Sequence, residues 1–192
     1  MLNNSSNMRS ATLIFDKISR RFRISYNDIY NPYKGILNIY TDGSVSKGTG
    51  GWSFIITSNN MILDQKNGKV TTNEYKPTKG IIYSDFAEMF AVREVTKFMM
   101  NNSDKFFESE SIYIHSDNIY VVKCFNEWLP GWIKKGWVTA SGKPVANREI
   151  IADINMDLRA LGSVKFIHVK GHSGDHFNEM ADTLAKEGRF LE

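Results

Sequence analysis

The stretch Ile39-Tyr-Thr-Asp-Gly-Ser44 is an apolar strand that carries the carboxylate of Asp42 and then breaks at a glycine. Three further acids stand at or near the ends of other predicted elements, and they are Glu88, Asp117 and Asp182. Four carboxylates on separated elements can converge in space when the chain folds. Because clustered carboxylates repel one another and raise each other's pKa, such a cluster is tolerated mainly where a divalent cation neutralises it.

The all-oxygen character of this set indicates which cation it would bind. Oxygen ligands favour Mg²⁺, with Mn²⁺ as a substitute. Two such ions about 3.5–4 Å apart are a known device for in-line hydrolysis of phosphodiesters. The four acids therefore predict a metal-dependent nuclease with two ions in its site.

Each acid also has an ordinary structural interpretation when it is taken alone. Asp42 and the glycine after it form a common turn dipeptide, and Asp117 precedes a predicted helix as an N-cap residue does. Glu88 can close a capping box opened by Asp85, and Asp182 can be a solvated acid in a helix rich in Glu and Lys. These interpretations apply only if the four acids are independent of one another.

The segments around the acids resemble, in chain order, those of type 1 ribonuclease H, from residue 36 to the C-terminus. The stretches that carry the resemblance are Tyr40-Thr-Asp-Gly-Ser44, Ala87-Glu-Met-Phe-Ala91, Ser116-Asp-Asn-Ile-Tyr-Val121, Trp128-(x3)-Trp132-Ile-Lys-Lys-Gly-Trp137, Val169-Lys-Gly-His-Ser-Gly174 and Asn178-Glu-Met-Ala-Asp182. The resemblance implies an endonuclease that hydrolyses the RNA strand of RNA–DNA hybrids by two-metal-ion catalysis. It also implies products with 5′-phosphate and 3′-hydroxyl ends.

Position by position, the resemblance assigns a metal-binding quartet, which consists of Asp42, Glu88, Asp117 and Asp182. His172 corresponds to the catalytic histidine of the family. An imidazole with an unperturbed pKa of about 6.5 can accept a proton from the nucleophilic water or help to release the product. The alternative for His172 is an ordinary histidine in a surface loop. The other three histidines are interpreted as structural or loop residues, and they are His115, His168 and His176.

Positive charge is concentrated in two parts of a chain whose net charge is only +3. Residues 1–35 carry six Lys or Arg against two acids, and residues 128–148, the basic block, contain four Lys or Arg, no acid and three of the four tryptophans. The basic block resembles the basic protrusion with which the family grips the DNA strand. Its predicted nucleic-acid contacts are Trp132, Lys134, Lys135, Trp137 and Lys143. Alternatively, the tryptophans, Trp128 first among them, anchor the core and the lysines lie on a solvated turn.

Recognition of the RNA strand requires contacts to 2′-hydroxyl groups. The family uses asparagines for this purpose, one in the turn after the first acid and a pair before the helix glutamate. Here the turn Ser44–Gly51 contains no asparagine, and Ser84-Asp85 stand in the place of the pair. The predicted contacts are therefore Ser44, Ser84 and Asn118.

At 192 residues, 42% hydrophobic and 23% charged, the chain can bury one core and carry an extension. We expect a basic N-terminal extension over 1–35, with a candidate hairpin over 11–25, and a catalytic domain over 36–192. No apolar run reaches the ~18 residues of a spanning helix, and the N-terminus has no signal-peptide core. With a single cysteine, Cys124, this favours an intracellular, cytoplasmic protein, or one in the nucleoid or nucleus where hybrids occur. We expect a monomer that needs no obligate protein partner.

The expected elements are strands over 36–43, 51–58 and 61–70, a helix over 85–100, a strand over 111–116, a helix over 118–128, a basic loop or short helix over 130–146, a helix over 147–160, a strand over 164–169 and a helix over 178–188. A meander of strands followed by strands that alternate with helices predicts an α/β ribonuclease H-like fold with a mixed five-stranded sheet flanked by helices.

Two other functions are compatible with the sequence. A nuclease or recombinase that acts on DNA could use the same acids on the same fold, although the His172 loop and the basic block argue against it. A hybrid-binding module without catalysis is the other alternative. Such a module is expected to have lost at least one of the acids, and all four are present.

Overall fold

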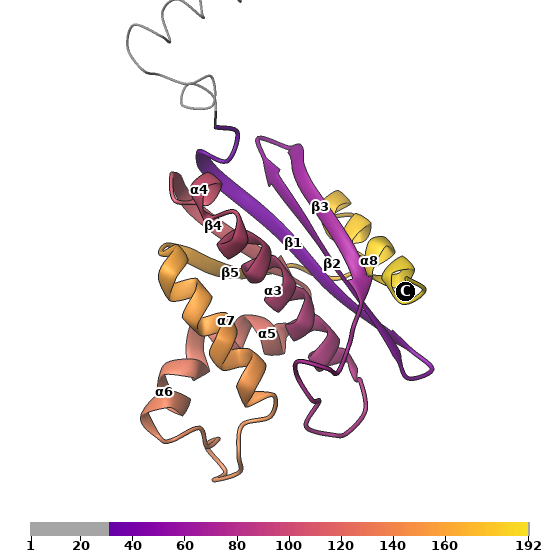
Figure 1. Ribbon diagram of the computed structural model, residues 1–192, viewed down its shortest axis with the longest axis vertical. Coiled ribbons are helices and arrows are strands. Elements are labelled where there is room, and N and C mark those ends of the chain that lie inside the picture. Colours follow the sequence, from indigo (N-terminus) through magenta and orange to yellow (C-terminus); the bar gives the residue numbers. More distant parts are fainter. Residues whose placement is uncertain (1–30, 192) are drawn as a thin grey trace, which may run out of the picture. The chain divides into compact units, whose positions relative to one another are not determined.

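Five strands form one mixed sheet in the computed structural model, which describes residues 31–191 (Figure 1). The strands are β1 Gly35–Ser46, β2 Thr49–Ser58, β3 Met61–Lys69, β4 Ser109–Ser116 and β5 Val164–His168, and their order in the sheet is β3-β2-β1-β4-β5. The first three strands pair antiparallel, whereas β4 runs parallel to β1 and β5 parallel to β4. The predicted mixed sheet is thus confirmed, while the predicted hairpin over 11–25 lies outside the described residues.

Helices lie on both faces of this sheet. They are α3 Ser84–Asn101, α4 Ser103–Phe106, α5 Ile119–Lys123, the π-helical segment η1 Cys124–Trp128, α6 Leu129–Lys134, α7 Arg148–Leu161 and α8 His176–Gly188. In Figure 1, α3 and α7 lie in front of the sheet, and α8 lies against β1, β2 and β3 on the other side. The short helix α4 was not predicted. The ends of the other elements agree with the prediction to within a few residues.

The glycine after Asp42 does not break the first strand, so the interpretation of this dipeptide as a turn is wrong. β1 continues to Ser46, and Gly43 pairs with Trp52 of β2. A β-carbon on Gly43 would lie 2.2 Å from the backbone nitrogen of Glu88. Gly43 is therefore required because α3 lies directly on the strand at this point.

Alternation along β1 places Asp42 on the opposite face from Gly43. Leu37 and Ile39, on the same face as Gly43, are fully buried in the core. Tyr40 shares the face of Asp42, and its ring lies 5.4 Å from that of Phe177 in α8. The strand therefore carries its carboxylate toward the side of the sheet on which α8 lies.

Small residues and backbone groups bring α8 close to the sheet. Ser53 donates a hydrogen bond to the carbonyl oxygen of Ala181 at 2.7 Å. A β-carbon on Gly51 would lie 2.1 Å from the carbonyl oxygen of Ala185. The helix begins at His176, two residues earlier than predicted, and Asp182 lies in its middle.

The basic block begins in an irregular helix. The predicted helix over 118–128 is divided into α5 and the π-helical segment η1, which leads into α6. Pro130 lies in the first turn of α6 and has no N–H to donate, so it is compatible with the start of a new helical segment there.

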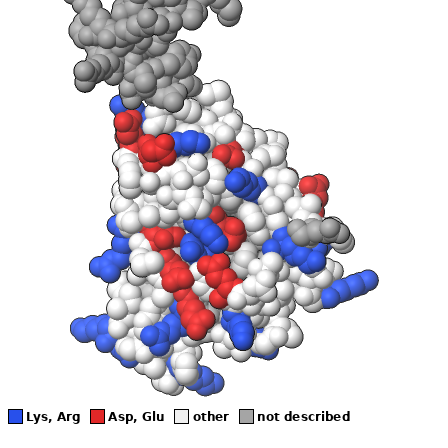
Figure 2. All heavy atoms as spheres, viewed as in Figure 1, with Lys and Arg blue, Asp and Glu red and all other residues white. Residues whose placement is uncertain are grey.

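The face formed by α3 and α7 has a distinct charge pattern. Acidic side chains form a band at its centre, and Lys and Arg side chains gather around its lower edge (Figure 2). Among the described residues, no helix combines the length and the hydropathy that crossing a membrane requires.

Candidate active site

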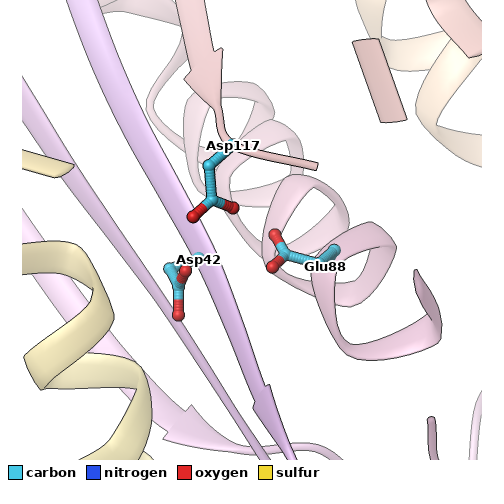
Figure 3. Close-up of side chains that lie close together, drawn as sticks. All are labelled: Asp42, Glu88 and Asp117. Atoms are coloured by element: carbon cyan, nitrogen blue, oxygen red, sulfur yellow. The ribbon is translucent and has the colours of Figure 1, made fainter. Parts of the chain in front are cut away.

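Three of the four predicted acids converge at the centre of the sheet. Asp42, Glu88 and Asp117 each offer a carboxylate oxygen, and these oxygens all lie within 4.8 Å of one another (Figure 3). Asp42 comes from β1, Asp117 directly follows the neighbouring parallel strand β4, and Glu88 comes from the first turns of α3. The close approach of α3 over Gly43 brings Glu88 to the two strand residues.

Burial makes this cluster electrostatically unfavourable when every member is charged. Asp42 is 6% exposed and Glu88 is 4% exposed. Burial raises the pKa of Asp42 to about 7, and the charges of Asp117 and Asp182 add to the effect. The pKa of Glu88 is also raised well above its ordinary value, first by burial and then by the charges of Asp42 and Asp117. At neutral pH the cluster therefore needs a bound proton or a bound cation.

An unpaired oxygen of Glu88 indicates that a cation suits this cluster. The Glu88 carboxylate accepts a hydrogen bond from the backbone of Gly43, but its Oε2 is buried and has no hydrogen-bond partner among the described residues. A buried acceptor without a donor is costly, and a hard divalent cation would satisfy it. The oxygen-only cluster of Asp42, Glu88 and Asp117 fits Mg²⁺ or Mn²⁺.

The fourth acid, Asp182, lies outside the three-carboxylate cluster. Its Oδ2 accepts a hydrogen bond from Lys186 Nζ at 2.6 Å, one turn further along α8. Asp182 is nevertheless near the cluster, because its charge raises the pKa of Asp42 and the charge of Lys186 lowers it. Sequence reasoning missed Lys186, although its spacing of four residues from Asp182 is the usual signal for a helical ion pair.

The capping interpretations of Asp117 and Glu88 are wrong. Asn118 caps α5, since its Oδ1 accepts hydrogen bonds from the backbone nitrogens of Tyr120 and Val121 at 2.9 and 3.3 Å. Its Nδ2 donates to Asp85 Oδ1 at 3.1 Å. The N-cap residue of α3 is Tyr83, and no side chain caps this helix. Asp117 and Glu88 are therefore not used for capping, while both polar atoms of the Asn118 side chain make contacts within the protein.

The loop that carries His172 lies directly against the acid cluster. A β-carbon on Gly171 would lie 2.6 Å from Asp117 Oδ2, so a side chain at this position would displace the Asp117 carboxylate. The loop is tied to α8 by a hydrogen bond from the backbone nitrogen of Gly174 to Glu179 Oε1 at 2.9 Å. His172 has a left-handed φ of 50°. Its side chain is exposed and makes no hydrogen bond in the described part of the chain.

A second histidine reaches the same region, and sequence reasoning interpreted it as structural. His168 Nε2 lies 3.2 Å from the main-chain oxygen of Asp117. His168 ends β5, the parallel neighbour of β4, and the carboxyl ends of parallel strands meet at one edge of a sheet. The position of His168 at the carboxyl end of a parallel strand was the signal in the sequence that could have placed it near the acids. His115, by contrast, stacks on Tyr40 with ring centroids 4.6 Å apart, which agrees with a structural role.

The predicted nucleic-acid contacts occupy two different environments. Trp132 and Trp137 are half-buried and pack against the core, as Trp128 does. The predicted lysines are exposed, and they are Lys134, Lys135 and Lys143. Ser84 is exposed at the start of α3, whereas Ser44 accepts a hydrogen bond from Arg189 Nη1 at 3.1 Å. The tryptophans that pack against the core and the solvated lysines agree with the structural alternative for the basic block. The contacts of these residues with nucleic acid stay a prediction.

The comparisons with known proteins identify the class of protein to which this sheet and its buried carboxylates belong. The RNase H family profile matches residues 34–190. The ribonuclease H of Treponema denticola is 34% identical over 157 residues, which cover 79% of this chain and 95% of that protein. The chain therefore belongs to the RNase H family, and it is a nuclease.

Solved structures show the same fold at lower sequence identity. The solution structure of the PFV RNase H domain has a TM-score of 0.60 and 20% identity, and the match covers 81% of this chain and 93% of that chain. The crystal structure of LC11-RNase H1 in complex with RNA/DNA hybrid has a TM-score of 0.57 and 19% identity, with 79% and 94% of the two chains covered.

Proposed function

We propose that this chain is a Mg²⁺-dependent endoribonuclease that hydrolyses the RNA strand of RNA–DNA hybrids. The observation that carries the proposal is the convergence of Asp42, Glu88 and Asp117 in a chain of the RNase H family. The relative from Treponema denticola is named ribonuclease H, and a structure of similar fold is a complex with RNA/DNA hybrid. Residues 36–192 form the catalytic domain in this proposal.

The acids take different roles. Asp42, Glu88 and Asp117 would hold two divalent ions, which would supply Lewis acidity and an activated water for an in-line displacement that leaves 5′-phosphate and 3′-hydroxyl ends. Asp42 would serve as a ligand for both ions, and Glu88 and Asp117 would complete the ligand set toward the attacking water and the leaving group. Asp182 is a peripheral ligand, which its position outside the cluster and its ion pair with Lys186 support.

His172 moves protons at the edge of this site. Its loop lies against Asp117, and its imidazole is exposed to solvent. An imidazole so placed can take a proton from the nucleophilic water or protonate the departing product. This role needs access to solvent and a position beside the carboxylates. The exposed side chain of His172 meets the first requirement, and the close approach of Gly171 to Asp117 meets the second.

Substrate binding uses exposed and half-buried groups around the acids. Ser84 at the start of α3 and Ser44 on β1 are the contacts to the RNA strand, with Asn118 acting through its bond to Asp85. The exposed lysines of the basic block attract the DNA backbone, and the solvent-accessible parts of the Trp132 and Trp137 rings offer flat surface beside them.

A cleavage assay with strand-specific labels tests the proposal. Purified protein is incubated with an RNA–DNA hybrid, with RNA–RNA and DNA–DNA duplexes and with single strands, in Mg²⁺, in Mn²⁺ and in EDTA. Metal-dependent cutting of the hybrid's RNA strand alone is expected, and Asp42→Asn should abolish it. Asp104→Asn, which alters an exposed acid on α4, is the matched control. Cutting of DNA would favour a DNA-acting enzyme instead, and hybrid binding without cleavage in either metal would refute the nuclease.

A further inference from the structure

Asp117 directly follows β4, and its main-chain oxygen is bound by a side chain. The ladder between β4 and β5 continues up to the hydrogen bond from the backbone nitrogen of Val169 to the carbonyl oxygen of Ser116 at 3.1 Å. One residue further on, no backbone N–H within residues 31–191 donates to the carbonyl oxygen of Asp117. His168 Nε2 lies 3.2 Å from that oxygen. Because a carbonyl oxygen can only accept, Nε2 carries the proton and donates. The imidazole therefore extends the ladder by one hydrogen bond.

This bond holds a residue that belongs to no helix or strand. β4 ends at Ser116 and α5 begins at Ile119, so Asp117 lies in the junction between them. The residue after it is tied back to the strand, since the backbone nitrogen of Asn118 donates to Ser116 Oγ at 3.1 Å. The bond from His168 is the link between the Asp117 carbonyl group and the neighbouring strand β5.

The chain that follows β5 thus contacts Asp117 at two places. Gly171 packs against the carboxylate, with no room for a β-carbon between them. His168 binds the main-chain oxygen. The carboxylate points from the end of β4 toward Asp42 (Figure 3), and its direction depends on how the main chain of Asp117 is held. Groups that hold a metal ligand in this way orient it toward the metal.

The strand that carries His168 is itself held from its outer side. β5 is an edge strand, and an edge leaves backbone groups unpaired. Here Asn126 Nδ2 donates to the carbonyl oxygen of Phe166 at 2.8 Å, and Asn126 Oδ1 accepts from the backbone nitrogen of Phe166 at 3.3 Å. Asn126 lies in the π-helical segment η1, and such segments occur frequently at functional sites. Two residues before His168, β5 is therefore fixed by β4 on one side and by η1 on the other.

His168 contributes nothing to the hydrophobic core. Its side chain is exposed, and in the described part of the chain it makes no ion pair and no second hydrogen bond. Phe166, which is 4% exposed, supplies the core contact of the same strand. A substitution at His168 therefore removes the bond to Asp117 and leaves the packing of β5 in place.

We propose that His168 is a positioning residue of the active site, which holds the main-chain oxygen of Asp117 and thereby sets the place of the Asp117 carboxylate in the metal-binding cluster. This inference rests on the proposed function, because it takes the cluster of Asp42, Glu88 and Asp117 as a metal site. Loss of a group that orients a metal ligand typically lowers metal affinity about 10- to 100-fold. The bond of His168 is exposed to solvent, so the expected loss is at the lower end, about 10-fold.

Direct binding of Mn²⁺ tests the proposal without nucleic acid or catalysis. Protein that retains Asp42 is titrated with Mn²⁺, and the free ion is measured by electron paramagnetic resonance. His168→Phe keeps an aromatic ring on the strand and removes the donor, so it should raise the Kd for Mn²⁺ about 10-fold. His168→Ala, which removes the ring as well, should do the same. His168→Gln places an amide N–H at a reach similar to that of Nε2 and should restore the Kd to within about twofold of the parent value.

His176→Phe is the matched control. His176 is an exposed histidine at the start of α8 and makes no hydrogen bond among the described residues. This variant should bind Mn²⁺ as the parent does, and urea unfolding should show that all the variants are folded. Equal Mn²⁺ affinities in His168→Phe and His176→Phe would overturn the proposal. A Kd for His168→Gln as high as that for His168→Phe would overturn it too, because the hydrogen bond would then not be the cause.

The proposed function is measured separately, by cleavage of the RNA–DNA hybrid with the parent protein in Mg²⁺. Cleavage by the parent together with equal Mn²⁺ affinities in all variants would reject the role of His168 and retain the activity. A Kd that rises in His168→Phe and recovers in His168→Gln, without cleavage by the parent, would retain the role of His168 and reject the ribonuclease.

Discussion

Replacement of Asp42 by asparagine should stabilise the metal-free protein while it abolishes catalysis. Asp42 is buried beside two other carboxylates, and its pKa rises from 3.8 to about 7. An acid whose pKa is raised on folding binds more protons in the native state between those two values, so the free energy of unfolding falls as the pH rises through that window. An amide of the same shape carries no charge and avoids this loss.

The magnitude follows from the size of the shift. At pH 8 the shift of Asp42 corresponds to about 4 kcal/mol of lost stability, since each pKa unit is worth about 1.4 kcal/mol. At pH 5.5 the native carboxyl is largely protonated, and the loss is about 2 kcal/mol. Asp42→Asn should therefore raise the free energy of unfolding by about twice as much at pH 8 as at pH 5.5.

Urea unfolding in EDTA at the two pH values measures this directly, with Asp104→Asn as the control for the loss of an exposed acid. Saturating Mg²⁺ should raise the stability of the parent protein at pH 8 and have a much smaller effect on Asp42→Asn, because the cation neutralises the same cluster. If Asp42→Asn is no more stable than the parent at pH 8 in EDTA, the cluster is not under electrostatic strain and the reasoning is refuted.

Three further predictions concern other residues. Gly43→Ala should lower the free energy of unfolding by about 2 kcal/mol in urea titrations, because the new methyl group meets the backbone of Glu88 and overpacking costs about 1–3 kcal/mol; an unchanged midpoint would contradict the close approach of α3. His172→Ala should lower kcat about 100-fold in steady-state assays, the scale of a lost general acid or base, while the Kd for the hybrid stays within about twofold. An unchanged kcat together with a weaker Kd would argue against proton transfer. Cys124 is fully buried and burial raises the pKa of its thiol to about 12, so Ellman's reagent should label it slowly in native buffer and rapidly in urea; fast native labelling would contradict its burial.

The order of elements follows from local patterns along the chain. Alternating and continuous apolar stretches specify the strands, and helical periodicity specifies α3, α7 and α8, because each pattern depends on residues close together in sequence. The number of strands and the mixed character of the sheet could therefore be predicted. Boundaries that depend on tertiary contacts could not be predicted. β1 continues past Gly43 because β2 pairs with it. The π-helical segment before Pro130 has no periodic signal in the sequence.

The acids of the site could also be named from the sequence, because each lies in or directly after a recognisable element and these elements come in a known order. The relative positions of these acids could not be predicted, since they depend on contacts between residues 29 to 75 positions apart in the chain. Only the folded chain places Asp42, Glu88 and Asp117 together and leaves Asp182 outside their cluster. The ion pair of Asp182 with Lys186 and the capping of α5 by Asn118 are contacts between near neighbours in sequence.

The loop that joins β3 to α3, residues 70–83, marks the same division. Its length is visible in the sequence, but the partner that fixes it is not, because all of α3, all of β4 and most of the basic block lie between Thr78 and Asn147. The sequence by itself thus determined the elements, the acids and the family, all of which depend on local pattern and chain order. Tertiary structure alone decided which groups meet, since hydrogen bonds, close glycine contacts and charge coupling act through space and take no account of distance along the chain.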